Sequence, residues 1–319
     1  MKIGFLYEPA YWLLLEKLIH DLEREVRLVG GESCRLSPTD LHRADADLIY
    51  VLPCDRIETL KQVEERLLII NSTQSQEIAI DKIATSRLLI DNGLPTPQTI
   101  ISQTPEPILK ALDDFGILLL KSVNLCGGAG HRVLRRRGGQ ILTTSRNRTY
   151  QVVFGARNQI RDGTIMLGPP YYAQQFIGGA TAQANDRVWR MYVVGKRVVM
   201  GTVRVKEGVD TPEKSIVNVA TGARYEFLEN LDAEMENLAL RMADLIGFEV
   251  GVVDFLRNRS GQPLIIEADC DGRYLFICRK FQEAAGYGNR YNLNAYIARH
   301  LADCIKRESD AKMVHGHSP

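Results

Sequence analysis

Two apolar runs in the C-terminal part of the chain predict a β-hairpin: Phe248-Glu-Val-Gly-Val-Val-Asp254-Phe-Leu and Pro263-Leu-Ile-Ile-Glu267-Ala-Asp269. The polar segment Arg257-Asn-Arg-Ser-Gly-Gln262 separates them and supplies the turn. In an antiparallel register centred on this turn, Asp254 lies opposite Glu267. Asp269 then points to the same face, because side chains alternate along a strand. The hairpin therefore predicts three carboxylates on one patch of an otherwise apolar sheet.

Carboxylates at close range repel one another, so this patch requires a compensating charge. Mg²⁺ is the simplest solution, because it takes oxygen ligands and often combines a few carboxylates with the phosphates of a nucleotide. A solvated acidic face without a ligand is the alternative, and a bulge in the hairpin would change the register. The pattern favours a metal site formed by Asp254, Glu267 and Asp269.

Composition limits the classes of protein to which the chain can belong. A length of 319 residues indicates two or three domains, and the net charge of +1 gives no drive toward nucleic acid or a membrane surface. No apolar run approaches the ~18 residues of a membrane span. The six cysteines are scattered without a C-x-x-C pair, which favours reduced thiols in a cytoplasmic protein over a zinc site or a disulfide framework.

The N-terminal part alternates predicted strands and helices, which is typical of a small parallel α/β sheet. A helix with Ser75 as its N-cap is predicted to run through Ile90, and Leu94-Pro-Thr-Pro97 then forces an extended connection. We expect three domains: an N-terminal α/β domain over 1–93, a central subdomain over 94–180 and a C-terminal subdomain over 181–319. The predicted elements are strands over 2–7, 47–53 and 67–71, helices over 11–27, 57–65, 231–246 and 292–307, and a hairpin over 189–205.

A glycine-rich segment follows the predicted strand that ends at Lys121. Glycines let the backbone turn sharply and point successive N–H groups at an anion, and a lysine adds a point charge for a phosphate. The order of residues is not that of a Walker loop, because a strand rather than a helix follows. A lid over phosphates and a glycine-rich turn without a ligand are both consistent with the glycines Gly127, Gly128 and Gly130.

Taken together and in order, these segments resemble the ATP-grasp superfamily, and within it the RimK-type, glutathione synthetase-like carboxylate–amine ligases. The resemblance runs from about residue 75 to 272, and residues 1–75 fit the N-terminal α/β domain of that family. The motifs that carry it are Asp81-Lys82 before Gly93-Leu-Pro-Thr-Pro97, Lys121 with Gly127-Gly-Ala-Gly130, Tyr172-Ala-Gln174-Gln175-Phe176-Ile177, Trp189-Arg190-Met-Tyr-Val-Val-Gly195, Val203-Arg204, Asn218, Asp254 and Glu267-Ala-Asp269.

The resemblance implies an ATP-grasp fold whose central and C-terminal subdomains clamp ATP. It implies a ligase that joins a small-molecule carboxylate to an amine, such as an amino acid or peptide, through an acyl-phosphate, releasing ADP and phosphate. Two Mg²⁺ ions, or Mn²⁺, belong to that chemistry, and a homodimer or homotetramer is expected. The implied roles are catalysis for Arg190, Arg204 and Asn218, nucleotide binding for Lys82, Lys121, Gly127, Gly128, Gly130, Gln174, Gln175, Phe176, Ile177 and Asp186, and metal binding for Asp254, Glu267 and Asp269.

The sequence departs from the family pattern at three positions. Asp269 stands where the family usually has asparagine, which makes the expected metal site one charge more negative. Gln175 replaces the common glutamate of the hinge strand, although an amide can still bond to adenine or ribose. Val188 replaces the aspartate that usually begins the arginine strand, so a ribose contact from Asn185 or Asp186 is left open.

Two other functions are consistent with the same residues. One is an ATP-grasp kinase that phosphorylates a small molecule, and the other is an ATP-binding regulator without turnover. A shared fold does not distinguish them, because function depends on the site. The segment Cys270-Asp-Gly-Arg273 lacks the "S-P-G" turn common in these ligases, so the sequence does not predict the acid, the amine or whether additions are repeated.

Overall fold

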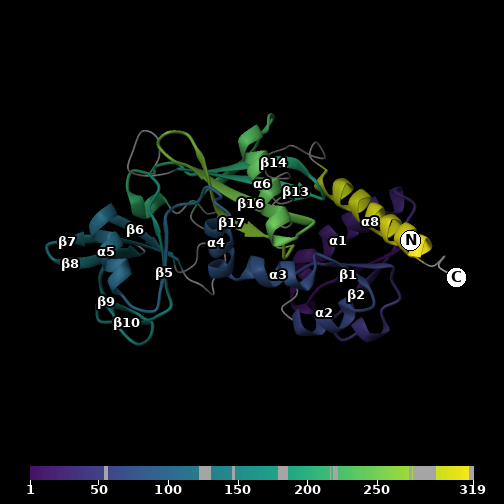
Figure 1. The fold of residues 1–319 in the computed structure, drawn as a ribbon, viewed down its shortest axis with the longest axis horizontal. Helices are drawn as coiled ribbons and strands as arrows, with labels where there is room; N and C mark the ends of the chain where they lie inside the picture. Colours follow the sequence, from purple (N-terminus) through teal and green to yellow (C-terminus); the bar gives the residue numbers. More distant parts are fainter. Residues whose placement is uncertain are drawn as a thin grey trace.

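The computed structural model describes residues 1–53, 57–121, 131–145, 148–178, 186–215, 217, 222–272, 275 and 292–315. Within these ranges the chain forms three β-sheets that follow one another along the sequence. The sheets are spread along the long axis of the molecule, with the five-stranded sheet between the other two (Figure 1). The mixed α/β class predicted from the sequence is confirmed.

The N-terminal sheet has the strand order β2-β1-β3-β4, and all neighbouring strands are parallel. Strand β3 is buried along its whole length, as expected for a parallel strand covered on both faces. The predicted alternation is confirmed, except that β2, which is half polar, was not predicted. The elements are β1 (Lys2–Leu6), η1 (Pro9–Tyr11), α1 (Trp12–Leu28), β2 (Glu32–Leu36), η2 (Leu41–Arg43), β3 (Leu48–Val51), α2 (Ile57–Glu64) and β4 (Leu68–Ile70).

Two helices, α3 (Thr73–Ile80) and α4 (Lys82–Asp91), replace the single helix predicted over 75–90. The prediction was wrong because Asp81 has an extended backbone, with φ −81° and ψ 98°, and its side chain accepts the first free N–H groups of α4. Aspartate is a strong N-cap, so a second helix begins there. Ser72, rather than Ser75, caps α3. The break places Lys82 in the first turn of α4.

The central sheet has eight strands in the order β10-β11-β9-β8-β7-β6-β12-β5. Helix α5 covers one face, where Leu112 packs with Leu118, Leu120 and Ala173. By alternation, Lys121 and Gln174 point to the opposite face. The elements are β5 (Thr99–Ser102), α5 (Glu106–Phe115), β6 (Ile117–Leu120), β7 (Arg132–Arg137), β8 (Gln140–Ser145), β9 (Arg148–Phe154), β10 (Gln159–Arg161), β11 (Thr164–Leu167) and β12 (Tyr171–Gln175).

The C-terminal sheet is antiparallel with the order β15-β14-β13-β16-β17, and the two predicted hairpins supply β13 with β14 and β16 with β17. Helix α6 ends at the left-handed Gly247, as predicted, and packs on one face through Met242 against Met191 and Val253. The other face carries Tyr192 and Arg190. The elements are β13 (Arg187–Val194), β14 (Arg197–Val205), η3 (Pro212–Ser215), β15 (Arg224–Phe227), α6 (Ala233–Ile246), β16 (Val250–Arg257) and β17 (Pro263–Asp269).

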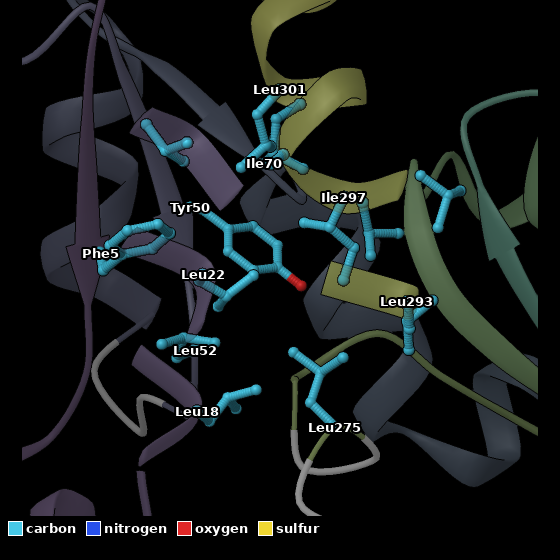
Figure 2. Packing of buried hydrophobic residues seen from close by; sticks show 14 of the residues in the cluster. Phe5, Leu18, Leu22, Tyr50, Leu52, Ile70, Leu275, Leu293, Ile297 and Leu301 are labelled. Carbon is cyan, nitrogen blue, oxygen red and sulfur yellow. The ribbon is translucent and has the colours of Figure 1, made fainter. Parts of the chain in front are cut away.

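Helix α8 (Leu293–His315) connects the C-terminal sheet to the N-terminal sheet. Figure 2 shows Ile297 and Leu301 of this helix on one side of Tyr50 and the N-terminal residue Phe5 on the other. The division at residues 93 and 180 stays a prediction: the three sheets follow it, but α8 packs against α1 of the first segment. No helix among the described residues is both long and apolar enough to cross a membrane.

Candidate nucleotide and metal site

The predicted register of the carboxylate hairpin is confirmed. Asp254 of β16 pairs directly with Glu267 of β17, and Val252 pairs with Asp269. The register shifts between Asp254 and Phe255, on the side of the turn, so the irregularity leaves the carboxylate pairing unchanged. Asp254, Glu267 and Asp269 therefore lie on one face of the sheet, as the alternation of side chains requires.

Asp254 is bound by two arginines from the neighbouring strands. Arg190 Nε and Nη2 donate to its two carboxylate oxygens over 2.7 and 2.9 Å, and Arg204 Nη2 donates to Oδ2 over 2.5 Å. The carboxylate is only 2% exposed. Burial alone would raise the pKa of Asp254, but the two guanidinium groups outweigh it and hold this pKa below its ordinary value. The sheet thus places a buried carboxylate beside two guanidinium groups, each of which can donate two parallel hydrogen bonds.

Two lysines from distant parts of the chain meet the same strand. Lys82 Nζ lies 3.6 Å from Glu267 Oε1, and Lys121 Nζ donates to the Ile266 carbonyl over 3.0 Å. Lys121 also lies over the ring of Tyr172 at 5.8 Å. Burial lowers the pKa of Lys121, because a charged ammonium loses hydration there. Helix α4, strand β6 and strand β17 therefore bring together the two lysines that the sequence assigned to phosphate.

Among the described residues, the charge of Arg190 favours the ionised form of Asp269 but does not outweigh its burial, in contrast to Asp254. Burial, followed by the nearby Asp271, raises the pKa of Asp269 well above its ordinary value. The Asp271 N–H donates to Asp269 Oδ1 over 3.0 Å. A divalent cation would relieve this penalty, and an all-oxygen donor set on one face is the set that Mg²⁺ prefers. The residues present therefore fit the metal that the resemblance implies.

The strand expected to bind adenine, β12, lies across from α4. Tyr172 Oη and Ser86 Oγ are 2.8 Å apart, and Gln174 Nε2 donates to Thr99 Oγ1 over 3.0 Å. Alternation places Gln174 on the same face as Lys121, and Gln175 on the face of α5. Phe176 and Ile177 follow the strand and are partly buried, and Asp186 is exposed just before β13.

Four predicted site residues, Gly127, Gly128, Gly130 and Asn218, lie outside the described residues. His131 is described, and it follows the glycine-rich segment directly. Burial, together with Lys121 and Lys82, lowers the pKa of His131 to about 3, so its imidazole is neutral near pH 7. Its Nε2 atom is buried and has no hydrogen-bond partner among the described residues.

Asn71 is an important residue that the sequence analysis missed. Its Nδ2 donates to the carbonyls of Val250 and Cys270 over 2.7 and 2.8 Å, and its Oδ1 accepts from the N–H groups of Glu249 and Val250. The side chain is buried, and it joins β16 to the residue that follows Asp269. A polar residue at the end of an apolar strand, Leu68–Ile70, is the signal that could have identified it.

Comparisons with known proteins assign the chain to a family. A family model described as a RimK-like ATP-grasp domain matches residues 79–284. A tetrahydromethanopterin:alpha-L-glutamate ligase of Methanocaldococcus jannaschii is 25% identical over 210 residues, which are 66% of this chain and 65% of the relative. The chain thus spans less than two thirds of the length of the curated relatives it matches.

Solved structures support the same fold. The ATP-grasp ligase PsnB, solved with a precursor variant, Mg and ADP, superposes with a TM-score of 0.62 at 15% identity, covering 95% of this chain and 98% of PsnB. The D-cycloserine synthetase DcsG superposes with a TM-score of 0.63 at 11% identity, covering 96% and 100%. These structures confirm the predicted fold, and the family model confirms the predicted family. The chain belongs to the RimK-like ATP-grasp family.

Proposed function

We propose that this chain is an ATP-dependent carboxylate–amine ligase that forms an amide bond through an acyl-phosphate and releases ADP and phosphate. The observation that carries the proposal is the meeting of Asp254 and Glu267 with four cationic side chains from three parts of the chain. Phosphoryl transfer depends mainly on positioning and charge neutralisation, and this set of groups supplies both.

The cationic residues divide into two groups by the surroundings of each side chain. Lys82 and Lys121 lie against β17 and are placed to bind phosphate oxygens in the ground state. Arg190 and Arg204 are planar donors at the sheet face, and they suit the substrate carboxylate and the phosphoryl group as charge develops on it. Asp254, Glu267 and Asp269 would hold Mg²⁺, or Mn²⁺, which supplies charge neutralisation at the phosphates.

We assign adenine and ribose recognition to the β12 segment and to Asp186. Gln174, Gln175, Phe176 and Ile177 are the proposed adenine-binding residues of this segment, and the Gln174 side chain shares the face of Lys121. The segment with Gly127, Gly128 and Gly130 would cover the phosphates and exclude water from a hydrolysable acyl-phosphate. Asn218 is proposed to contact the transferring group.

For the substrates we propose a small-molecule or peptide carboxylate and an α-amino acid as the amine. The name of the archaeal relative, a tetrahydromethanopterin:alpha-L-glutamate ligase, makes L-glutamate the first amine to test. A homodimer or homotetramer in the cytoplasm, acting without nucleic acid or membrane, stays a prediction.

The test is ADP release from Mg-ATP with panels of carboxylic acids and amino acids, followed by mass spectrometry of the products. A ligase releases ADP only when both an acid and an amine are present, and the product mass equals their sum minus water. A stable phosphorylated product formed without an amine would instead indicate a kinase. ATP binding without turnover over the whole panel would indicate a regulator.

A further inference from the structure

A second group of ligand-type side chains lies at the start of β16, away from Asp254. Glu249 precedes this strand, and His300 and Cys304 come from α8. Glu249 Oε2 is 2.7 Å from His300 Nε2 and 3.3 Å from Cys304 Sγ, and the sulfur is 3.4 Å from the imidazole nitrogen. One oxygen, one nitrogen and one sulfur donor therefore form a small triangle.

We propose that Glu249, His300 and Cys304 bind a Zn²⁺ ion. Zinc takes these three donor types at about 2.0–2.3 Å, so a tetrahedral site separates its donors by about 3.3–3.6 Å. Two sides of the observed triangle already have this length. The third, between Glu249 and His300, must open by about 0.6 Å to reach it, and Glu249 can move because its side chain is 40% exposed. The fourth position is left for water or an external ligand.

The backbone holds the three donors in place before any metal binds. His300 and Cys304 are four residues apart on α8 and so share one face of that helix. The imidazole lies against Gly195 in the turn between β13 and β14, where a side-chain carbon would come within 2.8 Å of the ring. The backbone of Glu249 is held by its N–H donation to Asn71 and by its carbonyl, which accepts from the Gly195 N–H over 2.7 Å.

The guanidinium group of Arg307 supplies the positive charge beside these donors. Its Nη2 donates to Cys304 Sγ over 3.0 Å and to Glu249 Oε2 over 3.3 Å. The Arg307 side chain is 64% exposed, so it can leave without opening the core. We therefore expect Arg307 to compete with the metal, and removing it should strengthen metal binding. If Glu249, His300 and Arg307 instead form only an ionic contact between α8 and the start of β16, removing Arg307 would weaken that contact.

This site differs in chemistry from the carboxylate site on the same sheet. Nitrogen and sulfur donors select zinc-like metals, whereas the oxygen donors of Asp254, Glu267 and Asp269 select Mg²⁺. Paired cysteines are the usual sequence signal for zinc, and their absence favoured reduced thiols over a zinc site. This site combines a single thiol, an imidazole on the same helix and a carboxylate 55 residues away in sequence. Such a combination has no recognisable spacing in the sequence.

The experiment is a Co²⁺ titration of the full chain, treated with a chelator beforehand and kept reduced. A thiolate ligand gives a sulfur-to-cobalt charge-transfer band, which oxygen ligands do not give. We expect one equivalent of this band in the unaltered protein. Cys304→Ser should abolish it, and His300→Ala should weaken Co²⁺ binding at least ~10-fold. Arg307→Ala should tighten binding, and Glu267→Gln, at the other site, should leave the band unchanged.

Thermal melting supplies a second measurement that does not depend on the cobalt spectrum. A ligand that binds only the folded state raises the melting temperature, so Zn²⁺ should stabilise the unaltered protein more than Cys304→Ser. No band in the unaltered protein, or a band that persists in Cys304→Ser, would overturn the proposal. Equal stabilisation of both proteins by Zn²⁺ would also overturn it.

Discussion

Two carboxylates, one just before strand β16 (Val250–Arg257) and one in its middle, have opposite surroundings. Asp254 is buried on the sheet face, where Arg190 and Arg204 bind it. Glu249, just before the strand, faces an imidazole and a thiol, and its side chain is 40% exposed. Both carboxyl groups have a lowered pKa: hydrogen bonding by His300 brings that of Glu249 to about 2, while the arginines outweigh burial at Asp254. The pKa of each carboxyl group is thus lowered by different partners.

The difference shows that the partners of a carboxylate, rather than its acidity, indicate its chemistry. A carboxylate among arginines, lysines and other carboxylates suits phosphate and a hard cation. A carboxylate beside nitrogen and sulfur donors suits a softer metal and holds two elements together. Asn71 connects the two settings, because it bonds to Glu249 at one end and to the carbonyl of Cys270, next to Asp269, at the other.

The largest expected effect separates the two carboxylate sites by turnover. Glu267→Gln should lower turnover at least ~10²-fold, because it removes a charged ligand at the transferring phosphate. Glu249→Gln is the matched control and should stay within about twofold, since it touches no reacting group. Steady-state kinetics with saturating Mg²⁺ measures both, and circular dichroism checks the fold. Near-normal rates in Glu267→Gln would contradict the metal assignment, as would equal losses in both variants.

Substitution of Asn71 tests whether its hydrogen bonds hold together the backbone segments that carry the two sites. Asn71→Ala leaves several buried backbone groups without partners, so the free energy of unfolding should fall by about 2–4 kcal/mol. Asn92→Ala removes an exposed hydrogen bond to the Leu88 carbonyl and should cost about 0.5 kcal/mol. Urea unfolding measures both variants. Equal stability of the two would show that the Asn71 hydrogen bonds do not hold the strands together.

Lysine and arginine should act at different stages within the carboxylate site. Lys121→Ala should weaken ATP binding by about tenfold, whereas Arg190→Ala should chiefly lower the catalytic rate, because only the arginine is assigned to charge that develops during transfer. Nucleotide affinity from calorimetry and rates from single-turnover kinetics separate the two effects. If both changes weakened ATP binding equally, this division of roles would be wrong.

The smallest effect concerns Asp269, where the sequence departs from the family pattern. Asp269→Asn keeps an oxygen toward the metal, so activity should remain within roughly tenfold, with a changed Mg²⁺ requirement because one negative charge is lost. Asp269→Ala removes the oxygen and should be far less active. Turnover measured against Mg²⁺ concentration compares them. Equal activity of the two variants would mean that Asp269 does not bind metal.

The sequence predicted features that depend on local pattern. The hairpin that pairs Asp254 with Glu267 follows from alternation and a turn, and the end of α6 follows from Gly247. Contacts between distant segments were not predictable in this way. The bond from Arg190 to Asp254 and the four bonds of Asn71 depend on how the strands pack. The break at Asp81 depends on whether this residue continues the first helix or caps the next one.

The proposed acyl-phosphate is tested most directly by following one oxygen atom. An acid that supports ADP release is labelled with ¹⁸O in its carboxylate and incubated with Mg-ATP, the amine and the unaltered protein. If the carboxylate attacks the γ-phosphate and the amine then displaces phosphate, one ¹⁸O appears in each phosphate released. Unlabelled phosphate released together with the amide product would contradict the proposed mechanism, because the oxygen lost from the carboxylate would then have left by another route, such as water.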